Sequence, residues 1–298
     1  MSGAAQGVSG HGASWNLGRL TVTHRSRPLV MGVLNLTPDS FFPASRQPGV
    51  EAALSRAEAM VTAGAEILDL GAESSRPGSD AVSVAEEQDR LLPVVTALRQ
   101  AFDTAITVDT YRPETARLAL DAGADAINDI AGGREPGMLE LAAERNCGLV
   151  LMHMQGRPRT MQDRPTYRDV VTEVTAWLAD QVERARSVGV KPDRLLVDPG
   201  IGFGKTLDHN LALLNALDRV AHGHPFLLGA SRKSFISHLT GAGVEHRLGG
   251  SLAALAAAVR ARATVVRVHD VPDSIQFLDV LAAIEAGDRT DIEPGASS

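Results

Sequence analysis

The sequence is poor in cysteine, in aromatic residues and in positive charge. Its single cysteine, Cys147, cannot form an internal disulfide, which argues against a disulfide-stapled secreted domain. Aromatic residues make up 4% of the chain, which disfavours an aromatic-rich β-sandwich. The formal net charge of −7 argues against a nucleic-acid-binding protein, because phosphate neutralisation needs a basic face. No apolar run approaches the ~20 residues that span a bilayer, and we see no apolar leader. We therefore expect a cytoplasmic protein with neither a membrane nor a nucleic-acid partner.

What the 298 residues do contain is a regular alternation of short apolar runs and longer amphipathic stretches. The predicted strands are 29–35, 66–71, 105–109, 125–129, 148–153, 194–198, 225–230 and 264–268. The predicted helices are 50–63, 84–101, 113–122, 136–146, 167–188, 208–220, 246–262 and 271–286. Eight β-then-α units predict a single α/β domain, a (β/α)8 TIM barrel, over 15–286. A doubly wound open sheet usually has fewer strands and is the weaker alternative. Residues 15–27 predict a short N-terminal hairpin that plugs the barrel, and 1–14 and 287–298 are expected to be mobile tails.

Polar residues stand at the carboxyl end of nearly every predicted strand, which is the end that carries the active site of such barrels. These residues are Asn35, Asp109, Asn128, His153, Asp198, the run Ser231 to Lys233, Arg267 and His269. One such residue is usually a loop cap, but a series at one end favours a functional site. Arg267 and His269 are two apart on one strand, so they share a face and are typical of an anion site. Asp198 after the apolar run of its strand is either a structural N–H acceptor or the acceptor for a planar ligand edge.

Two features resemble other kinds of site without matching them. The stretch 200–206 (GIGFGKT) looks like a phosphate-binding loop, but Pro199 stands where a Walker loop needs its first glycine. Lys205 likewise replaces the last glycine of a dinucleotide fingerprint. The nine histidines show no metal-ligand spacing. The stretch is therefore interpreted as a glycine-rich turn, and the sequence leaves open whether Lys205 reaches a ligand.

Eight short motifs, taken in order, resemble the dihydropteroate synthase family. They are MGVLNLTPDSF at 31–41, DLGAESSRPG at 69–78, TVDT at 107–110, NDI at 128–130, LMHMQG at 151–156, DPGIGFGK at 198–205, GASRKS at 229–234 and RVHDV at 267–271. The family joins 6-hydroxymethyl-7,8-dihydropterin pyrophosphate to p-aminobenzoate, which gives 7,8-dihydropteroate and pyrophosphate on the route to folate. No covalent enzyme nucleophile is implied, which agrees with the lack of an activated Ser-His or Cys-His pair.

The resemblance also implies roles for individual residues. The pterin would contact Asp109, Asn128, Met152, Asp198, Phe203 and Lys233, with Asp198 accepting from the ring N–H and the exocyclic amine. The pyrophosphate would be held by Asn35, Arg76, Arg267 and His269. A Mg2+ ion would bridge the phosphates to the side-chain oxygen of Asn35. The catalytic residues would be Asp109, Lys233 and Arg76, which stabilise charge as the pyrophosphate leaves.

The same resemblance implies a slot for p-aminobenzoate between loops 36–47 and 72–80. It would be lined by Phe41, Ser75, Pro77, Arg232, Lys233 and Ser234, the carboxylate facing Arg232 or the start of a helix near Ser234. Sulfonamides mimic this substrate and would bind there. A homodimer through the late helices is the family tendency.

The first loop departs from the family pattern. The usual S-F-S-D-G-G is replaced by residues 40–46 (SFFPASR), so an acidic residue and two glycines are missing between Phe42 and Arg46. Pro43 restricts the backbone where glycines would free it, although Asp39 remains. This departure keeps open a catalytically silent pterin-binding paralogue. A pterin-dependent methyltransferase is the other alternative, but it would leave Arg76, Arg267 and His269 without a role.

Overall fold

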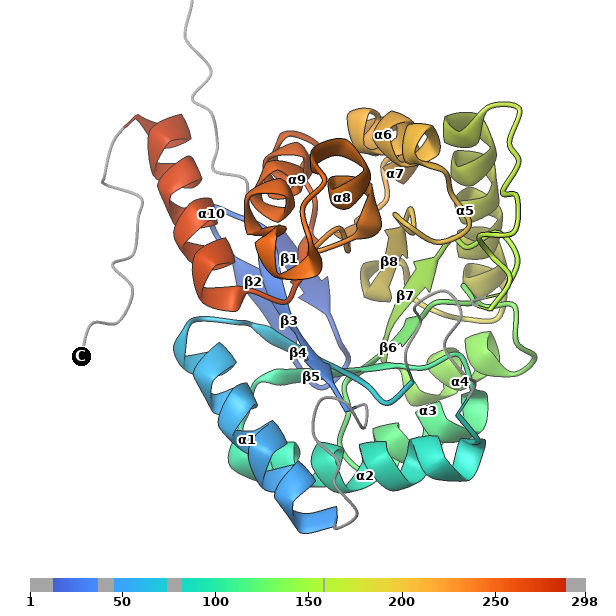
Figure 1. The fold of residues 1–298 in the computed structure, drawn as a ribbon. Coiled ribbons are helices and arrows are strands. Elements are labelled where there is room, and N and C mark those ends of the chain that lie inside the picture. Colours follow the sequence, from blue (N-terminus) through green and yellow to red (C-terminus); the bar gives the residue numbers. More distant parts are fainter. Residues whose placement is uncertain (1–12, 37–45, 74–81, 158, 288–298) are drawn as a thin grey trace, which may run out of the picture.

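The computed structural model describes residues 13–36, 46–73, 82–157 and 159–287, and its centre is an eight-stranded parallel barrel (Figure 1). The strands are β3 (Leu29–Asn35), β4 (Ile67–Gly71), β5 (Ala105–Asp109), β6 (Ala126–Asp129), β7 (Gly148–Met152), β8 (Leu195–Asp198), β9 (Leu227–Leu228) and β10 (Val265–Val268). Strands β3 to β8 pair in sequence order, and β10 lies between β3 and β9. A parallel bridge between Val197 and Phe226 joins β8 to the segment before β9 and closes the ring. The predicted barrel is confirmed, although its seventh strand is shorter than expected.

Helices enclose the barrel on its outer side (Figure 1). They are α1 (Arg46–Thr62), α2 (Val84–Ala101), α3 (Pro113–Asp121), α4 (Met138–Arg145), α5 (Val170–Ser187), α6 (Leu207–Asn215), α7 (Leu217–Ala221), α8 (Ser234–Thr240), α9 (Leu248–Arg260) and α10 (Val271–Ala286), with short 3-10 turns η1 (Pro192–Arg194) and η2 (Val244–His246). The single helix predicted over 208–220 was wrong in one respect, because a break at Ala216 divides it. Among the described residues, no helix combines the length and the apolar character needed to cross a bilayer.

Strand side chains alternate between two apolar cores, because successive residues of a strand face opposite sides of the sheet. The outer core, between strands and helices, includes Val30, Leu68, Ile106, Leu149, Val197 and Val266. The inner core lies at the amino ends of the strands and includes Leu29, Met31, Ile67, Ala105, Val150, Leu196, Leu227 and Val265. The carboxyl halves of the same inward faces carry polar residues. The sequence therefore builds a barrel with an apolar floor and a polar mouth.

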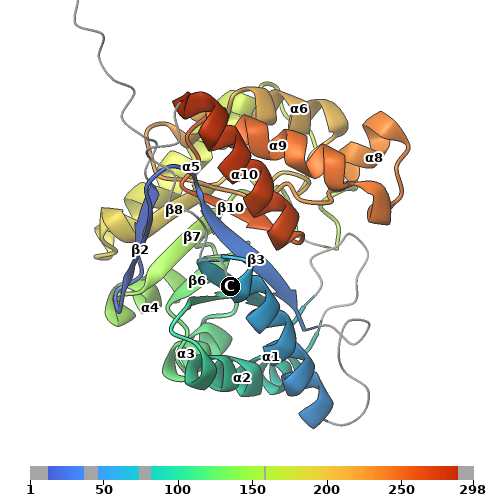
Figure 2. The same ribbon diagram turned by 90° about the vertical axis from the view of Figure 1, so that its left-hand side faces the viewer.

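A hairpin of β1 (Ala13–Asn16) and β2 (Thr21–His24) covers the apolar floor. Trp15, Leu17 and Val22 of this hairpin are buried in the inner core with the first residues of the strands. The indole N–H of Trp15 donates to the carbonyl oxygen of Arg194 at 2.9 Å. Figure 2 shows the hairpin at the end of the barrel where β3 begins. The predicted plug is confirmed, and its first strand starts at Ala13, two residues before the expected domain boundary.

Candidate active site

Polar side chains form a layer inside the barrel at the carboxyl ends of its strands. The register places Asp69 of β4 beside Thr107 of β5. Two residues further along the same strands, Gly71 lies beside Asp109. Asp109 in turn lies beside Asn128 of β6. Because these residues are two apart on their strands, their side chains share the inward face. The residues that the sequence placed at successive strand ends therefore meet at one mouth of the barrel.

Arg267 occupies the centre of this layer. Its Nε donates to Asp69 Oδ2 at 2.6 Å, and its Nη2 donates to Asp109 Oδ2 at 2.9 Å. Asp69 has no exposed surface and also accepts from Thr107 Oγ1 at 2.5 Å and from Asn128 Nδ2 at 3.3 Å. One guanidinium thus pairs with two carboxylates at once. Sequence reasoning assigned no role to Asp69 or Thr107, although the two-residue spacing to known mouth residues was the available signal.

The electrostatics of Asp109 follow from this crowding. Burial raises the pKa of Asp109 to about 7; Arg267 opposes the shift, and the neighbouring carboxylate of Asp69 adds to it. Two buried carboxylates sharing one cation resist simultaneous ionisation, because the second negative charge is only partly compensated. Asp109 is therefore poised to gain negative charge when a cationic group arrives beside it.

Asp198 and Lys233 form a second polar group beside the first. Asp198 Oδ1 accepts from the backbone N–H of Gly200 at 2.7 Å, and Oδ2 has no hydrogen-bond donor within the part of the chain that the structure describes. Burial raises the pKa of Asp198, and Lys233 opposes that shift. Lys233 Nζ donates to the carbonyl oxygen of Ile201 and lies 4.2 Å from the ring centroid of Phe203. Burial lowers the pKa of Lys233 to about 8. A carboxylate with one free oxygen suits a ligand edge that carries N–H donors.

An apolar wall faces these charges. Met152, Ile130, Met154 and Met161 form a small buried cluster, and Phe203 packs against it. Sequence analysis placed Met152 and Phe203 at a ring-binding surface, and the structure brings the two residues together. Flat aromatic ligands are commonly held between such apolar side chains while a few polar groups fix their orientation.

The predicted anion site lies where β10 ends. His269 Nδ1 is 3.1 Å from Ser231 Oγ, and burial lowers the pKa of His269 to about 4, helped by Arg267 and Arg232. Arg232 forms a two-pronged ion pair with Asp270, in which Nε lies 2.9 Å from Oδ2. Two nitrogens of Arg232 are thus already engaged. Its predicted contact with a carboxylate ligand stays a prediction, as does that of Ser234, the first residue of α8.

The glycine-rich turn 200–206 is held from inside by Lys205. Lys205 Nζ donates to the carbonyl oxygens of Phe203 at 2.9 Å and His153 at 3.3 Å, and it lies 3.0 Å from His153 Nδ1. Gly200 has a φ of +65°, and a Cβ there would lie 1.9 Å from the His153 carbonyl oxygen. The close approach of the two segments therefore requires glycine. The buried Nζ of Lys205 thus contacts backbone carbonyls and the ring of His153.

Replacing Lys205 with methionine is expected to lower the free energy of unfolding by about 1–3 kcal/mol, because two buried carbonyls lose their donor. Burial lowers the pKa of Lys205 from 10.5 to about 7. Between pH 7 and pH 10.5 Lys205 is protonated in the unfolded chain and largely deprotonated in the folded one. The contribution of Lys205 to the free energy of unfolding therefore rises with pH. Urea unfolding at pH 7 and pH 9.5 should therefore show a wider gap between wild type and variant at the higher pH. Lys191→Met, at an exposed lysine, is the control; a gap that narrows would contradict the expectation.

A charged network that sequence analysis did not foresee supports the β4 and β5 ends from outside. Arg112 Nη1 lies 2.8 Å from Glu73 Oε2 and 2.9 Å from Glu87 Oε2. Glu87 of α2 is buried and accepts from Thr110 and Thr115 at 2.7 Å each. The network holds the residue that follows β4 against the residues that follow β5. No sequence motif signals it, because its members come from three separate segments.

Several predicted contacts fall outside the described residues. They are Phe41, Ser75, Arg76 and Pro77, together with Asp39 and most of the atypical first loop. Their roles stay predictions. Asn35, the predicted metal ligand, is described: it ends β3 beside Gly71 of β4. Among the described residues, no three His, Cys, Asp or Glu side chains form a metal-binding group.

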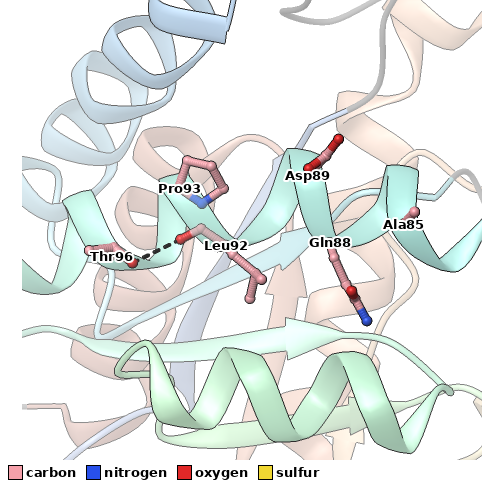
Figure 3. Close-up of a pocket in the computed structure, with 6 residues that line it drawn as sticks. All are labelled: Ala85, Gln88, Asp89, Leu92, Pro93 and Thr96. Atoms are coloured by element: carbon pink, nitrogen blue, oxygen red, sulfur yellow. Dashed lines mark hydrogen bonds between the residues drawn. The ribbon is translucent and has the colours of Figure 1, made fainter.

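A surface hollow lies along α2, away from these residues (Figure 3). It is lined by Ala85, Gln88, Asp89, Leu92, Pro93 and Thr96. Pro93 lacks a backbone N–H, and Thr96 Oγ1 donates to the carbonyl oxygen of Leu92 at 3.0 Å. None of the residues that the sequence assigned to the site lines this hollow. The polar mouth of the barrel is therefore the better candidate for chemistry.

Comparison with known proteins points to one family. The family model described as pterin binding enzyme matches residues 31–269. The dihydropteroate synthase of Escherichia coli K12 is 46% identical over 259 residues, which cover 87% of this chain and 92% of that protein. The dihydropteroate synthase of Synechocystis is 43% identical over 261 residues, covering 87% of this chain and 90% of that protein.

Solved structures agree with the sequence comparison. The dihydropteroate synthase of Yersinia pestis with a sulfonamide drug is 41% identical with a TM-score of 0.85, covering 92% of this chain and 99% of that one. The Xanthomonas albilineans enzyme with 4-aminobenzoic acid is 41% identical with a TM-score of 0.85, covering 92% of this chain and 98% of that one. The Burkholderia cenocepacia enzyme complexed with 7,8-dihydropteroate is 44% identical with a TM-score of 0.83, covering 92% of this chain and 97% of that one. The sequence and structure comparisons therefore agree on one family.

Proposed function

This chain belongs to the dihydropteroate synthases of the pterin-binding enzyme family, and from that premise we propose which of its residues carry out the reaction. The enzyme is a transferase that joins the methylene carbon of dihydropterin pyrophosphate to the amino nitrogen of p-aminobenzoate. The observation that carries the assignment is the polar mouth itself, in which Arg267 bridges Asp69 and Asp109 beside Asp198 and Lys233. The altered first loop is the one feature that favours a silent paralogue, and a methyltransferase would leave Arg267 and His269 without a role.

The pterin is proposed to lie on the apolar wall with its amino-pyrimidine edge toward Asp198. Oδ2, which has no donor among the described residues, supports this orientation, because the ring N–H and the exocyclic amine are both donors. Lys233 then faces the acceptor side of the ring, and Asn128 completes the polar rim. Met152 and Phe203 supply the apolar contact.

Departure of pyrophosphate is the step for which the charges are arranged. The carbon–oxygen bond of the methylene breaks, pyrophosphate takes the electron pair, and a cation conjugated with the pterin remains. The amino lone pair of p-aminobenzoate then forms the carbon–nitrogen bond, and the amino group loses a proton to solvent. We propose that Asp109 stabilises the cation, which would draw the pKa of its carboxyl down from about 7. Arg267 and His269, with Arg76, hold the leaving group.

We propose Mg2+ as the metal of this site. Asn35 offers an amide oxygen at the end of β3, and hard cations often take one or two protein oxygens and complete their shell with phosphate oxygens and water. The lack of a three-carboxylate group among the described residues fits such a substrate-dependent site. When bound, the ion supplies positive charge to the phosphate oxygens.

p-Aminobenzoate is proposed to approach the pterin methylene from the side of Lys233, Arg232 and Ser234. Phe41, Ser75 and Pro77 are proposed to line the same slot, and sulfonamides to compete for it. Because Asp270 already engages two nitrogens of Arg232, we expect the start of α8 to carry more of the carboxylate recognition.

We also propose a homodimer and a cytoplasmic location. Leu239 on α8 and Val280 and Ile284 on α10 are more than half exposed, which supports a contact through the late helices. The single cysteine, Cys147, has no second thiol in this sequence with which to form a disulfide, which supports a reducing compartment. The acidic net charge supports a protein without a nucleic-acid partner.

The direct test is release of pyrophosphate by the purified protein from dihydropterin pyrophosphate. Release should require p-aminobenzoate, yield dihydropteroate, and fall on chelation of Mg2+ and return when it is restored. Binding of the pterin without product would favour the silent paralogue and point to the departure at 42–46. Full activity in the presence of chelator would refute the proposed Mg2+ site and leave the proposed reaction standing.

A further inference from the structure

The hydroxyl of Ser231 lies between two nitrogens of one residue. Ser231 Oγ is 3.2 Å from the backbone nitrogen of His269 and 3.1 Å from its ring Nδ1. Ser231 is buried, and its hydroxyl has no third partner within the described part of the chain. The ring Nε2 of His269 makes no hydrogen bond to the described residues. Ser231, the third residue after β9, thus contacts one side of the imidazole.

The roles in this arrangement follow from counting protons. The backbone N–H of His269 can only donate, so Ser231 Oγ accepts from it. If Nδ1 also carried a proton and donated, the hydroxyl hydrogen of Ser231 would be left without an acceptor at a buried position, which costs about 1–3 kcal/mol. If Nδ1 is bare, the hydroxyl donates to it, both groups are satisfied, and the Nε2–H stays available for a ligand. The tautomer with an unprotonated Nδ1 therefore has the lower free energy.

We propose that Ser231 is a positioning residue that holds His269 in the tautomer with a bare Nδ1 and a protonated Nε2. His269 then presents a neutral N–H donor on the side away from Ser231. The inference rests on the proposed role of His269 at the pyrophosphate, and it names how that role is met. Nothing in it requires His269 to lose or gain a proton during the reaction.

The surroundings of His269 support a neutral ring. The charges of Arg267, Arg232 and Lys233 act against protonation of the ring, and that of Asp270 favours it. Together with burial they lower the pKa of His269 to about 4, below the ordinary value of 6.5. An imidazolium donor would be lost as pH rises through neutrality, whereas a neutral N–H donor persists across that range. Arg267 then supplies the positive charge that attracts the pyrophosphate, and the N–H of His269 supplies a directional hydrogen bond to it.

Nitrogen NMR of the imidazole rings tests the proposal on the whole protein at pH 7. His269→Gln assigns the ring signals among the nine histidines. Wild type is expected to show a protonated Nε2 and an unprotonated, hydrogen-bonded Nδ1. A protonated Nδ1, or an imidazolium, would overturn the proposal. Adding inorganic pyrophosphate should shift Nε2; an unmoved Nε2 would refute the proposed anion role while leaving the tautomer assignment intact.

Ser231→Ala tests whether the serine sets the tautomer. The Nδ1 and Nε2 signals of His269 should move toward each other as the two tautomers mix, and Kd for pyrophosphate should rise about tenfold. Ser231→Thr keeps the hydroxyl and should restore the wild-type pattern. Ser251→Ala is the matched control, because Ser251 Oγ also bonds two backbone groups nearby, Arg232 N and Arg247 O, without touching His269. Unchanged His269 signals in Ser231→Ala would remove Ser231 from the inference.

Discussion

Replacing Asp198 with asparagine is expected to lower kcat/KM for dihydropterin pyrophosphate by about 100-fold to 10,000-fold. Two hydrogen bonds to a charged acceptor, each contributing about 1.5–3 kcal/mol, are lost or weakened, and each 1.4 kcal/mol is a factor of ten. The amide also turns one acceptor into a donor that faces the donors of the pterin. Steady-state kinetics with the pterin substrate varied will measure the loss, which we expect mainly in KM.

The fold should survive this substitution. Burial raises the pKa of Asp198, so the ionised carboxylate lowers the free energy of unfolding as pH rises through its folded pKa. A neutral amide removes that penalty, and urea unfolding at pH 8 should show the variant at least as stable as wild type. Asp193→Asn, at a carboxylate that accepts from Asn16 near the opposite end of the barrel, is the control with unchanged kinetics. Wild-type kcat/KM in Asp198→Asn would refute the proposed pterin orientation.

Replacing Arg267 with methionine is expected to lower the free energy of unfolding by about 3–5 kcal/mol at pH 8, because two buried carboxylates lose their shared countercharge. The loss should shrink at low pH. The pKa of Asp109 already stands at about 7, and without Arg267 it rises further, so Asp109 is protonated in the variant over more of the pH range. A raised folded pKa contributes stability at low pH that is lost as pH rises through it. Urea unfolding at pH 5.5 and pH 8 should therefore show the larger difference at pH 8.

Activity separates this effect from simple destabilisation. Arg267→Met should lose pyrophosphate release by at least about 100-fold at a temperature where it remains folded, since the leaving group loses a cation. Arg99→Met is the matched control: Arg99 pairs at 2.6 Å with the buried Asp125 at the opposite end of the barrel, where Arg19 remains as a second partner. That variant should lose stability and keep its activity. Equal stability of Arg267→Met and wild type at pH 8 would show that the bridge contributes little.

Local patterning was enough to place nearly all the elements. The apolar run ending in Asn35 and the run ending in Asp109 became β3 and β5 over the predicted residues, because strand alternation and helix amphipathicity are short-range signals. Two elements differ from the prediction. The strand expected over 225–230 keeps only Leu227–Leu228 in regular pairing, because it closes the ring through a single bridge. The helix expected over 208–220 breaks at Ala216, where neither glycine nor proline marks a boundary.

The partners of the site residues were decided by the tertiary structure. The amino-acid sequence by itself determined that polar groups stand at the carboxyl ends of the strands and that Arg267 and His269 share a face. It did not determine that Arg267 would bridge Asp69 and Asp109, which lie 198 and 158 residues away. Such pairings depend on barrel closure and strand register, which arise from the packing of all eight strands together and from no single segment. For the same reason the turn lysine faces backbone inside the protein, although its motif resembles a phosphate loop.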